Sequence, residues 1–426
     1  MQNDCFPDAT KDWPKLPVSA LAEQNPCYVV KRNKEYPFIE MASVGENFGG
    51  ILKIETRTME GSGLTRFCVN DTLFAKITPC PENGKVAFVS GLPSPLGIGS
   101  TEFIVLSPRE MTSPKFLFHL VCSHAVRGRA AARMEGSTGR QRVPEDVFER
   151  RLLVPVPGPN EQAAIACILD AVDAALVRTR STVARARDLD HSLLHDLFEK
   201  GLDPNRCGKR QFPAHWNPRR VDEVAEVGSG VTLGKDVSGF KSVELPYLRV
   251  ANVQDGHLDL SDIKTVRVRV SEVENYRLEV GDVLMTEGGD LDKLGRGTIW
   301  EGQIPDCLHQ NHIFRIRANR ELLVPEFFSL VVESDIAKRY FNRVAKRTTN
   351  LASTNKTQVR AFQFPVPPTT DEQREIVAIM KAAKGRLASL LQKERALSEL
   401  KKSLMHDLFT GIVRVDPALL KWEKLS

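Results

Sequence analysis

The sequence predicts a mixed α/β protein in which an α/β module followed by one long helix occurs twice. Three observations lead to this prediction: a 38-residue segment that recurs along the chain, the helical spacing of its apolar residues, and the short strand-like runs that precede each copy. At roughly 150 residues per domain, a chain of 426 residues has room for two or three folded domains.

The recurring segment lies at residues 161–198 and 372–409. The two copies align without a gap at an offset of 211, and 13 of 38 positions are identical, including the run His-Asp-Leu-Phe at 195–198 and 406–409. Near the front of each half, Trp13 matches Trp216 at an offset of 203. A repeat this long exceeds the period of a solenoid, so the sequence indicates a duplicated module.

Both copies are predicted to be long helices, because their apolar residues alternate at spacings of three and four like a coiled-coil seam. The first seam, with Thr179 and Asp190 as weak positions, comprises Ile165, Leu169, Val172, Leu176, Val183, Ala186, Leu193 and Leu197. The second, broken by Glu394 and Lys401, comprises Ile376, Met380, Ala383, Leu387, Leu390, Leu397, Leu404 and Leu408.

The ends of the two helices are marked by proline and glycine. Each helix follows a proline-rich stop at 155–160 or 365–370 and has acidic residues in its first turn, where the helix dipole favours them. Gly201 and Gly411 close the helices. At 1.5 Å per residue, about 40 residues make a rod of roughly 60 Å. Each seam must be buried, either on a globular core or against the other rod, and the recurrence favours a helix pair that holds two domains apart.

The segments before the rods, 13–157 and 213–367, are expected to be mixed α/β modules. Strand-like runs occur at 85–89, 103–106, 245–250 and 313–317, separated by Gly, Pro and Asn. The apolar stretches 113–126 and 324–341 are more typical of helices.

The composition points to a cytoplasmic protein with reduced cysteines. The N-terminal residues have no apolar core of the kind a signal peptide needs, and no apolar stretch reaches the roughly 18 residues of a membrane span. The eight cysteines are scattered, with no spacing typical of zinc ligands. The net charge of +5 is too small to demonstrate nucleic-acid binding, so the placement of the charge must decide.

The sequence has no GxSxG nucleophile elbow, no GxGxxG dinucleotide motif and no Asn-Pro-Pro-aromatic tetrapeptide, which favours a protein without an active site of its own. The segment 228–236 resembles a phosphate-binding loop, but Ser229 and Asp236 replace residues that such a loop requires, so a turn is expected. His309 and His312 lack further ligands at metal spacing. His195 and His406 lie near helix ends, where a cation offsets the dipole.

Two basic segments occupy matching places in the two halves. A charge run alone is often a solvated face, but two at equivalent positions favour a shared anionic ligand. DNA fits, because Arg and Lys contact phosphates and Arg, Asn and Gln pair with base edges. The candidates of the first half are Arg127, Arg129, Arg133, Arg140, Gln141 and Arg142. Those of the second half are Lys338, Arg339, Arg343, Lys346, Arg347, Asn350, Asn355, Lys356, Gln358 and Arg360.

The chain resembles the DNA-specificity subunits of type I restriction-modification systems over about residues 13–413. The similar motifs lie in the same order in both: AKITPCPENGK (75–85), GSTEFIVLSP (99–108), GSTGRQRV (136–143), HWNPRRVDEVAEVGSG (215–230), GDVLMTEGGDLDKLGR (281–296) and NKTQVRAFQFPVP (355–367), with the two repeated helices. By this resemblance, loops that face DNA carry Lys76, Lys85, Lys293 and Arg296.

The resemblance implies two similar α/β target-recognition domains separated by a long antiparallel two-helix coiled coil with pseudo-two-fold symmetry. The expected boundaries are recognition domains at 1–157 and 204–367, repeated helices at 158–203 and 368–413, and a tail at 414–426. The implied partners are double-stranded DNA, two methyltransferase subunits and, in the full nuclease, restriction and translocase subunits. Adenosylmethionine and ATP chemistry would belong to those partners, and no cofactor or metal is expected on this chain.

Three further expectations concern function. The halves match poorly between the Trp region and the rod, so the target is expected to be bipartite and asymmetric. The same chain could serve as the specificity partner of a fused nuclease-methyltransferase. From another class, it could be a coiled-coil scaffold whose globular ends bind proteins, and the salt dependence of DNA binding separates these readings.

Overall fold

The computed structural model of the chain describes residues 3–60, 63–137, 139–203, 212–289, 294–347, 352–416 and 418. The fold is mixed α/β, as predicted, and it divides into two compact units. Unit 1 consists of Met1–Ser181 with Gln392–Ser426, and unit 2 is Thr182–Leu391. Each long helix therefore contributes one part to each unit, so the units do not divide the chain at the expected domain boundaries, which stay a proposal.

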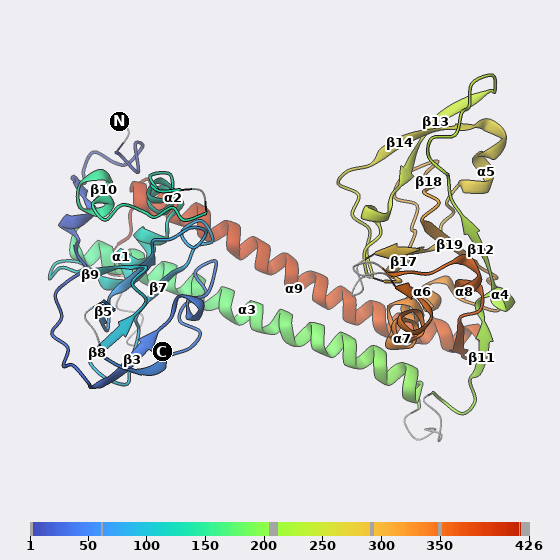
Figure 1. Cartoon of the computed structure of the whole chain (residues 1–426), viewed down its shortest axis with the longest axis horizontal. Helices are drawn as coiled ribbons and strands as arrows, with labels where there is room; N and C mark the ends of the chain where they lie inside the picture. Colours follow the sequence, from blue (N-terminus) through green and yellow to red (C-terminus); the bar gives the residue numbers. More distant parts are fainter. Residues whose placement is uncertain are drawn as a thin grey trace. The chain divides into compact units, whose positions relative to one another are not determined.

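Unit 1 is built on a four-stranded antiparallel sheet in the order β2-β9-β6-β7. A second sheet has the order β4-β3-β8-β5, and β1 pairs with β10. The strands are β1 Lys15–Pro17, β2 Ala22–Gln24, β3 Glu35–Ile39, β4 Glu55–Thr58, β5 Thr65–Cys68, β6 Thr72–Ala75, β7 Val86–Phe88, β8 Leu96–Gly99, β9 Phe103–Pro108 and β10 Leu153–Pro155. The helices before the first rod are η1 Val18–Ala20, η2 Met41–Ser43, α1 Pro114–Cys122, α2 His124–Ala131 and η3 Val147–Arg151. Helix α1 packs on β6, β7 and β9 (Figure 1).

Unit 2 has the corresponding four-stranded sheet in the order β12-β19-β15-β17. Its smaller sheets are β14-β13-β18, β16-β21-β20 and the pair β11-β22. The strands are β11 Asn217–Arg220, β12 Ala225–Ser229, β13 Ser242–Leu248, β14 Lys264–Arg269, β15 Val283–Thr286, β16 Gly288–Gly289, β17 Gly297–Ile299, β18 Leu308–His309, β19 Ile313–Ala318, β20 Lys346–Arg347, β21 Ala352–Ser353 and β22 Gln363–Val366. The short helices are α4 Val221–Val224, η5 Val250–Asn252, α5 Val273–Tyr276, η6 Val270–Glu272, α6 Pro325–Glu333, α7 Asp335–Val344 and α8 Lys356–Arg360. Helix α6 packs on β15 and β17.

The two units share the arrangement of their four-stranded sheet, as the sequence repeat predicts. In each, the second sheet contains a parallel pair, β3 with β8 and β13 with β18. The predicted strand runs fall in β7, β9, β13 and β19. The apolar stretches at 113–126 and 324–341 each form two helices instead of one, because the Ser123 Oγ donates to the Leu120 carbonyl and the Ser334 Oγ to the Val331 carbonyl, both at 2.6 Å.

The predicted rods are the helices α3, Pro159–Lys200, and α9, Thr370–Thr410. Each begins with the same anchor on its own module: the Oε1 of Gln162 accepts from the Ser113 amide at 3.0 Å, and that of Gln373 from the Val324 amide at 2.8 Å. Just beyond their ends, Gly201 and Gly411 have φ of +69° and +70°, the left-handed conformation that glycine adopts without strain.

Within each unit the two helices run antiparallel and bury or half-bury the predicted seam. In unit 1 Leu176 is 5% exposed, and the charged residues that interrupt the second seam are paired across the helices. The Lys401 Nζ lies 2.5 Å from the Asp173 Oδ1, and the Arg180 Nε donates to the Glu394 Oε1 at 2.9 Å. The interruptions in the apolar pattern therefore mark interhelical ion pairs.

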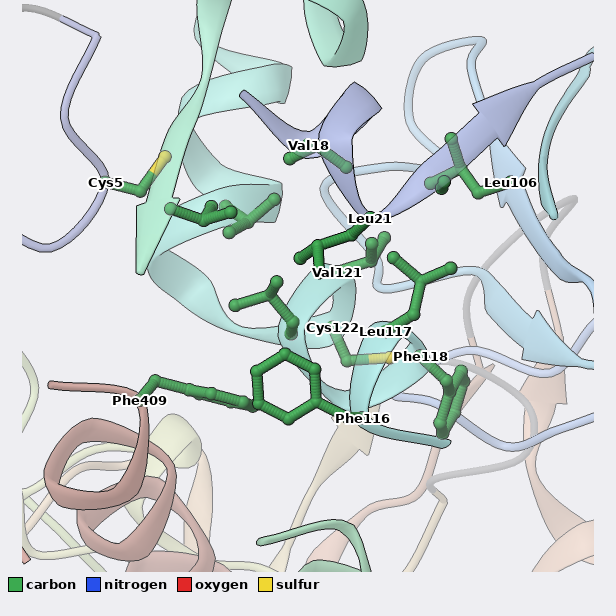
Figure 2. Close-up of a cluster of buried hydrophobic side chains, with 14 of the residues drawn as sticks. Cys5, Val18, Leu21, Leu106, Phe116, Leu117, Phe118, Val121, Cys122 and Phe409 are labelled. Carbon is green, nitrogen blue, oxygen red and sulfur yellow. The ribbon is translucent and has the colours of Figure 1, made fainter. Parts of the chain in front are cut away.

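The end of each long helix enters the core of a unit. Figure 2 shows Phe409 of α9 against Phe116 of α1 in unit 1, with ring centroids 5.5 Å apart. In unit 2, Phe198 of α3 packs against Phe327 and the buried Trp216. Burial of such large rings contributes several kcal/mol each to stability.

The remaining motifs behave as structural features within the described part of the chain. Residues 233–234 form a turn, as expected for the loop at 228–236. His309 is buried in β18, and burial lowers the pKa of its imidazole to about 4. No group of three metal-binding side chains and no helix capable of crossing a membrane occurs among the described residues. Cys5, Cys27, Cys68, Cys80, Cys122 and Cys307 are free, and Cys207 lies outside the described residues.

Candidate nucleic-acid interface

Each unit carries the same small hairpin, and both hairpins belong to the predicted basic segments. In unit 2, β20 and β21 pair at Lys346 and Ser353, and β21 also pairs with β16 at Gly288. In unit 1, Arg142 forms bridges to Glu135 and to Ile77. All three positions differ by 211 between the units, so the two hairpins dock in the same register on equivalent loops. We call the described residues 135–137 and 139–142 of unit 1, and 346–347 and 352–353 of unit 2, the basic hairpins.

The loop that receives the hairpin of unit 2 lies in the motif at 281–296, but its contact with the hairpin was not apparent from the sequence. A Cβ at Gly288 would lie 2.8 Å from the Ala352 carbonyl oxygen, a distance that real Cβ atoms do not tolerate. Glycine therefore permits the close approach of the two backbones. The signal available in the sequence was the Gly-Gly pair at 288–289, which reads as a turn unless the partner strand is known.

The cations of the unit 2 hairpin face solvent. Lys346 and Arg347 are exposed, and the Arg347 Nη2 donates to the Asn342 carbonyl at 2.7 Å. This bond holds the guanidinium against the end of α7 while leaving its other N–H groups available to an anion.

Helix α7 presents a basic face next to the hairpin in sequence. Ala337 and Phe341 anchor its buried side, which leaves Arg339 and Arg343 exposed. The Arg343 guanidinium lies 5.7 Å from the Tyr340 ring centroid. Lys338 is half-buried, with its Nζ 3.0 Å from the Asp255 Oδ2. Asp255 is distant in sequence. The segment 338–360 contains no acid, but in the folded protein an acid from elsewhere in the chain lies next to it.

Helix α8 uses the two predicted amide side chains as caps. The Asn355 Oδ1 accepts from the Gln358 amide at 2.9 Å, and the Gln358 Oε1 accepts from the Asn355 amide at 3.0 Å. The cap orients the two cations of the helix: Arg360 is exposed and Lys356 half-buried. Burial and the nearby charge of Arg360 lower the pKa of Lys356. Keeping Lys356 protonated beside Arg360 therefore costs free energy, which a bound phosphate would offset.

Three candidates of unit 1 are tied to backbone carbonyls. The Arg127 Nη1 donates to the Pro81 and Glu82 carbonyls at 2.7 and 2.9 Å, the Arg129 Nη1 to the Cys5 carbonyl at 2.8 Å, and the Arg133 Nη1 to the Arg129 carbonyl at 3.0 Å. These bonds join α2 to the loop at 81–82 and to the N-terminal segment. These three arginines therefore help to hold unit 1 together.

The hairpin of unit 1 carries the other candidates. Arg140 is exposed beside Gly139, Gln141 is half-buried, and Arg142 is exposed. The Arg142 Nε and Nη2 donate to both oxygens of Glu102 at 2.9 and 2.7 Å, and these hydrogen bonds hold the pKa of Glu102 below its usual value. Arg140 is thus more accessible than Arg142 to an anionic ligand.

The loop cations expected from the family resemblance lie near these elements. The Lys76 Nζ is 3.4 Å from Glu145 Oε1, the Lys85 Nζ donates to the Met41 carbonyl at 3.3 Å, and the Arg296 Nη1 donates to the Gln254 Oε1 at 2.6 Å. Lys293 and Asn350 lie outside the described residues.

Comparisons with known proteins concern the family that the chain resembles. Residues 213–398 match the family model of the type I restriction modification DNA specificity domain. The resemblance expected from the sequence motifs is thereby confirmed, and the family model matches the second half of the chain.

Two relatives illustrate the match. The putative type I restriction enzyme MjaX specificity subunit of Methanocaldococcus jannaschii is 26% identical over 222 residues, covering 51% of this chain and 50% of the relative. The type I restriction enzyme EcoKI specificity subunit of Escherichia coli is 25% identical over 319 residues, covering 70% of this chain and 66% of the relative. The chain thus spans between half and about two thirds of the length of these relatives.

The fold is also found in solved structures. The S subunit of a type I restriction-modification system from M. genitalium matches with a TM-score of 0.57 and 17% identity, over 95% of this chain and 99% of that chain. At this identity the similarity concerns the fold.

Proposed function

We propose that this chain is the DNA-sequence-reading subunit of a type I restriction-modification complex and that it catalyses nothing itself. The observation that carries the proposal is the pair of basic hairpins, docked in one register on two units that share the arrangement of their four-stranded sheet. The match of residues 213–398 to a DNA specificity domain supports it. Cations of the hairpins and of α7 and α8 would contact phosphates, and side chains beside them would reach base edges.

The half-sites read by the two units are proposed to differ. Arg142 and Glu135 of the first hairpin correspond to Ser353 and Lys346 of the second, so the groups offered to DNA are not the same. Two unlike readers on one chain would give a bipartite, asymmetric target. The methyl transfer and the ATP-driven steps would then belong to partner subunits.

Binding of the isolated chain to duplex DNA at several salt concentrations tests this function. Contacts to phosphates release counterions, so the logarithm of the affinity is expected to fall linearly with the logarithm of salt, with a slope of about −0.9 for each contact. A protein-binding scaffold would show weak DNA affinity with no such slope. A fused nuclease-methyltransferase as partner would leave this result unchanged, because the chain would read DNA in the same way.

The ends of the long helices are the proposed docking sites for two methyltransferase subunits. In unit 2, His195 lines a hollow of about 160 Å³ together with Ser334 and Leu194. In unit 1, His406 lines a hollow of about 670 Å³ with Ser123 and Met405. These residues correspond pairwise at the offset of 211, so the chain offers two hollows at equivalent positions, although they differ in volume.

Substitution of outward residues beside these hollows is expected to release the partner. Leu189 and Leu400 are equivalent and exposed, and so are His195 and His406. Changing each Leu to Asp and each His to Arg should reduce co-purification of the methyltransferase, since none of the four lies in the buried seam. Duplex binding by the isolated variant serves as the control for folding. Retention of two partner copies would argue against docking at these sites.

The long helices are also proposed to set the gap between the half-sites. Four residues added at the middle of α3, close to one turn, lengthen it by about 6 Å. At about 3.4 Å per base pair, the preferred spacer should grow by one or two pairs while the half-site bases stay unchanged. The insertion also turns the far end by about 40° and disturbs the seam, so some stability is lost. Sequencing of methylated DNA measures the spacer, and an active variant with the old spacer would show that the helix does not set it.

A further inference from the structure

The ends of the two long helices occupy equivalent sites through identical apolar residues. Phe409 lies 5.5 Å from Phe116 in unit 1, and Phe198 lies 5.5 Å from Phe327 in unit 2. Phe409 and Phe198 are 211 residues apart in the sequence, and so are Phe327 and Phe116. These apolar contacts (Figure 2 shows those of unit 1) therefore cannot distinguish the end of α9 from the end of α3.

The charged groups next to the apolar contacts do distinguish them. In unit 1, α3 supplies two acids: Asp173, whose Oδ1 lies 2.5 Å from the Lys401 Nζ, and Asp170, whose Oδ1 lies 2.9 Å from the buried His119 Nε2. The Lys401 side chain is 11% exposed. The end of α9 that packs in unit 1 therefore brings the cation Lys401 next to the acid Asp173.

In unit 2 the signs are reversed at the same positions. Asp190 of α3 takes the place of Lys401, and Lys384 and Lys381 of α9 take the places of Asp173 and Asp170. The Lys384 Nζ lies 2.5 Å from the Glu333 Oε2. Burial raises the pKa of Asp190, and the nearby charge of Lys384 opposes that rise. The end of α3 that packs in unit 2 therefore carries an acid, Asp190, near the cation Lys384.

Exchange of the two helix ends would bring like charges together in both units. The end of α3 in unit 1 would set Asp190 beside Asp173, and the end of α9 in unit 2 would set Lys401 beside Lys384. The exchange would also replace Glu394, the partner of Arg180, by Val183. Partly buried like charges in contact are strongly unfavourable, so rejection of the wrong helix follows from repulsion and not from shape.

We propose that this charge reversal selects which helix end each unit accepts, so that each half of the chain pairs with the other half and rejects a second copy of itself. Duplicated halves with interchangeable apolar contacts could otherwise self-pair between molecules. Asp190 and Lys401 are the residues that decide the selection. This selection acts on the pairing of the halves and does not depend on what the chain binds.

A full chain with a protease site inserted within residues 204–211 tests the proposal after it has folded and been cut. Two preparations, with different tags on their first halves and different tags on their second halves, are mixed in mild denaturant and returned to buffer. Capture by one tag should recover second halves of both preparations, which demonstrates exchange. It should recover the other first half at less than about a tenth of the amount of second half, since a tenfold preference needs about 1.4 kcal/mol.

Asp190→Lys should raise capture of the other first half at least tenfold, because Lys at this position would face Asp173 of the second copy. Lys401→Asp should do the same for second halves. Asp188→Lys, an equal change of charge at an exposed position of the same helix, is the matched control and should leave self-pairing low. Self-pairing of wild-type halves as readily as cross-pairing, or equal effects of Asp188→Lys and Asp190→Lys, would overturn the proposal.

If the cut halves do not exchange, thermal unfolding of the uncut chain decides. Lys401→Asp should lower the unfolding midpoint by several degrees more than Lys402→Asp at the exposed neighbouring position, and Asp173→Lys combined with Lys401→Asp should recover most of the loss. Equal midpoints for Lys401→Asp and Lys402→Asp would show that the charges do not select the helix.

Discussion

Replacement of Lys346, Arg347 and Arg360 by alanine is expected to weaken duplex binding by on the order of 10²–10³-fold at about 0.1 M salt and to reduce the salt slope by about three. All three side chains are exposed, on the hairpin of unit 2 and on α8. Each lost phosphate contact removes the release of about one counterion. Affinity titrations at several salt concentrations measure both quantities.

The matched control removes three cations elsewhere in the chain. Lys381, Arg386 and Lys393 are exposed on α9, so their replacement changes the net charge by the same amount. The control should retain the wild-type slope, because a general loss of charge removes no specific contact. If the hairpin variant keeps both its affinity and its slope, the hairpin of unit 2 does not touch DNA.

Phe198→Ala is expected to lower the free energy of unfolding of unit 2 by about 3–5 kcal/mol. The ring is 3% exposed and lies between Phe327 and Trp216, with centroids 5.5 and 6.1 Å away. Its removal leaves a cavity among rigid aromatic neighbours that cannot collapse to fill it. Denaturant unfolding followed by tryptophan fluorescence reports on the site, because Trp216 is in contact with it.

Leu189→Ala on the same helix is the control for this substitution. The Leu189 side chain is 60% exposed, so its loss should change stability by less than about 0.5 kcal/mol. Equal effects of the two substitutions would mean that the end of α3 does not pack in unit 2 as described.

The repeat, the strands and the two rods could be predicted from the sequence because their signals are local or periodic. The seam residues recur at helical spacing, and Gly201 and Gly411 mark the helix ends. Even the interruptions at Glu394 and Lys401 were visible in the pattern. Their cause was not, because their partners Arg180 and Asp173 lie more than 200 residues away.

The candidate interface was predicted in outline, and its details depended on non-local contacts. The basic segments fold as equivalent hairpins, but Lys338 meets Asp255 and Arg142 meets Glu102, acids that composition along the segment does not reveal. The sequence suggests Asn355 as an amide that reads bases. In the structure its side chain instead caps α8 together with Gln358. A capping residue and a base-reading residue are of the same type, so the sequence alone does not separate the two roles.

Sequencing of modified bases in DNA from cells that carry this chain with its methyltransferase partner tests the central claim most directly. If two unlike units read DNA from one chain, methylation should fall on one bipartite motif, with two different half-sites separated by a gap of fixed length whose bases are not read. The modification should disappear when the gene for this chain is deleted and return when it is restored. A contiguous motif, two identical half-sites, or a methylation pattern that does not depend on this chain would contradict the account.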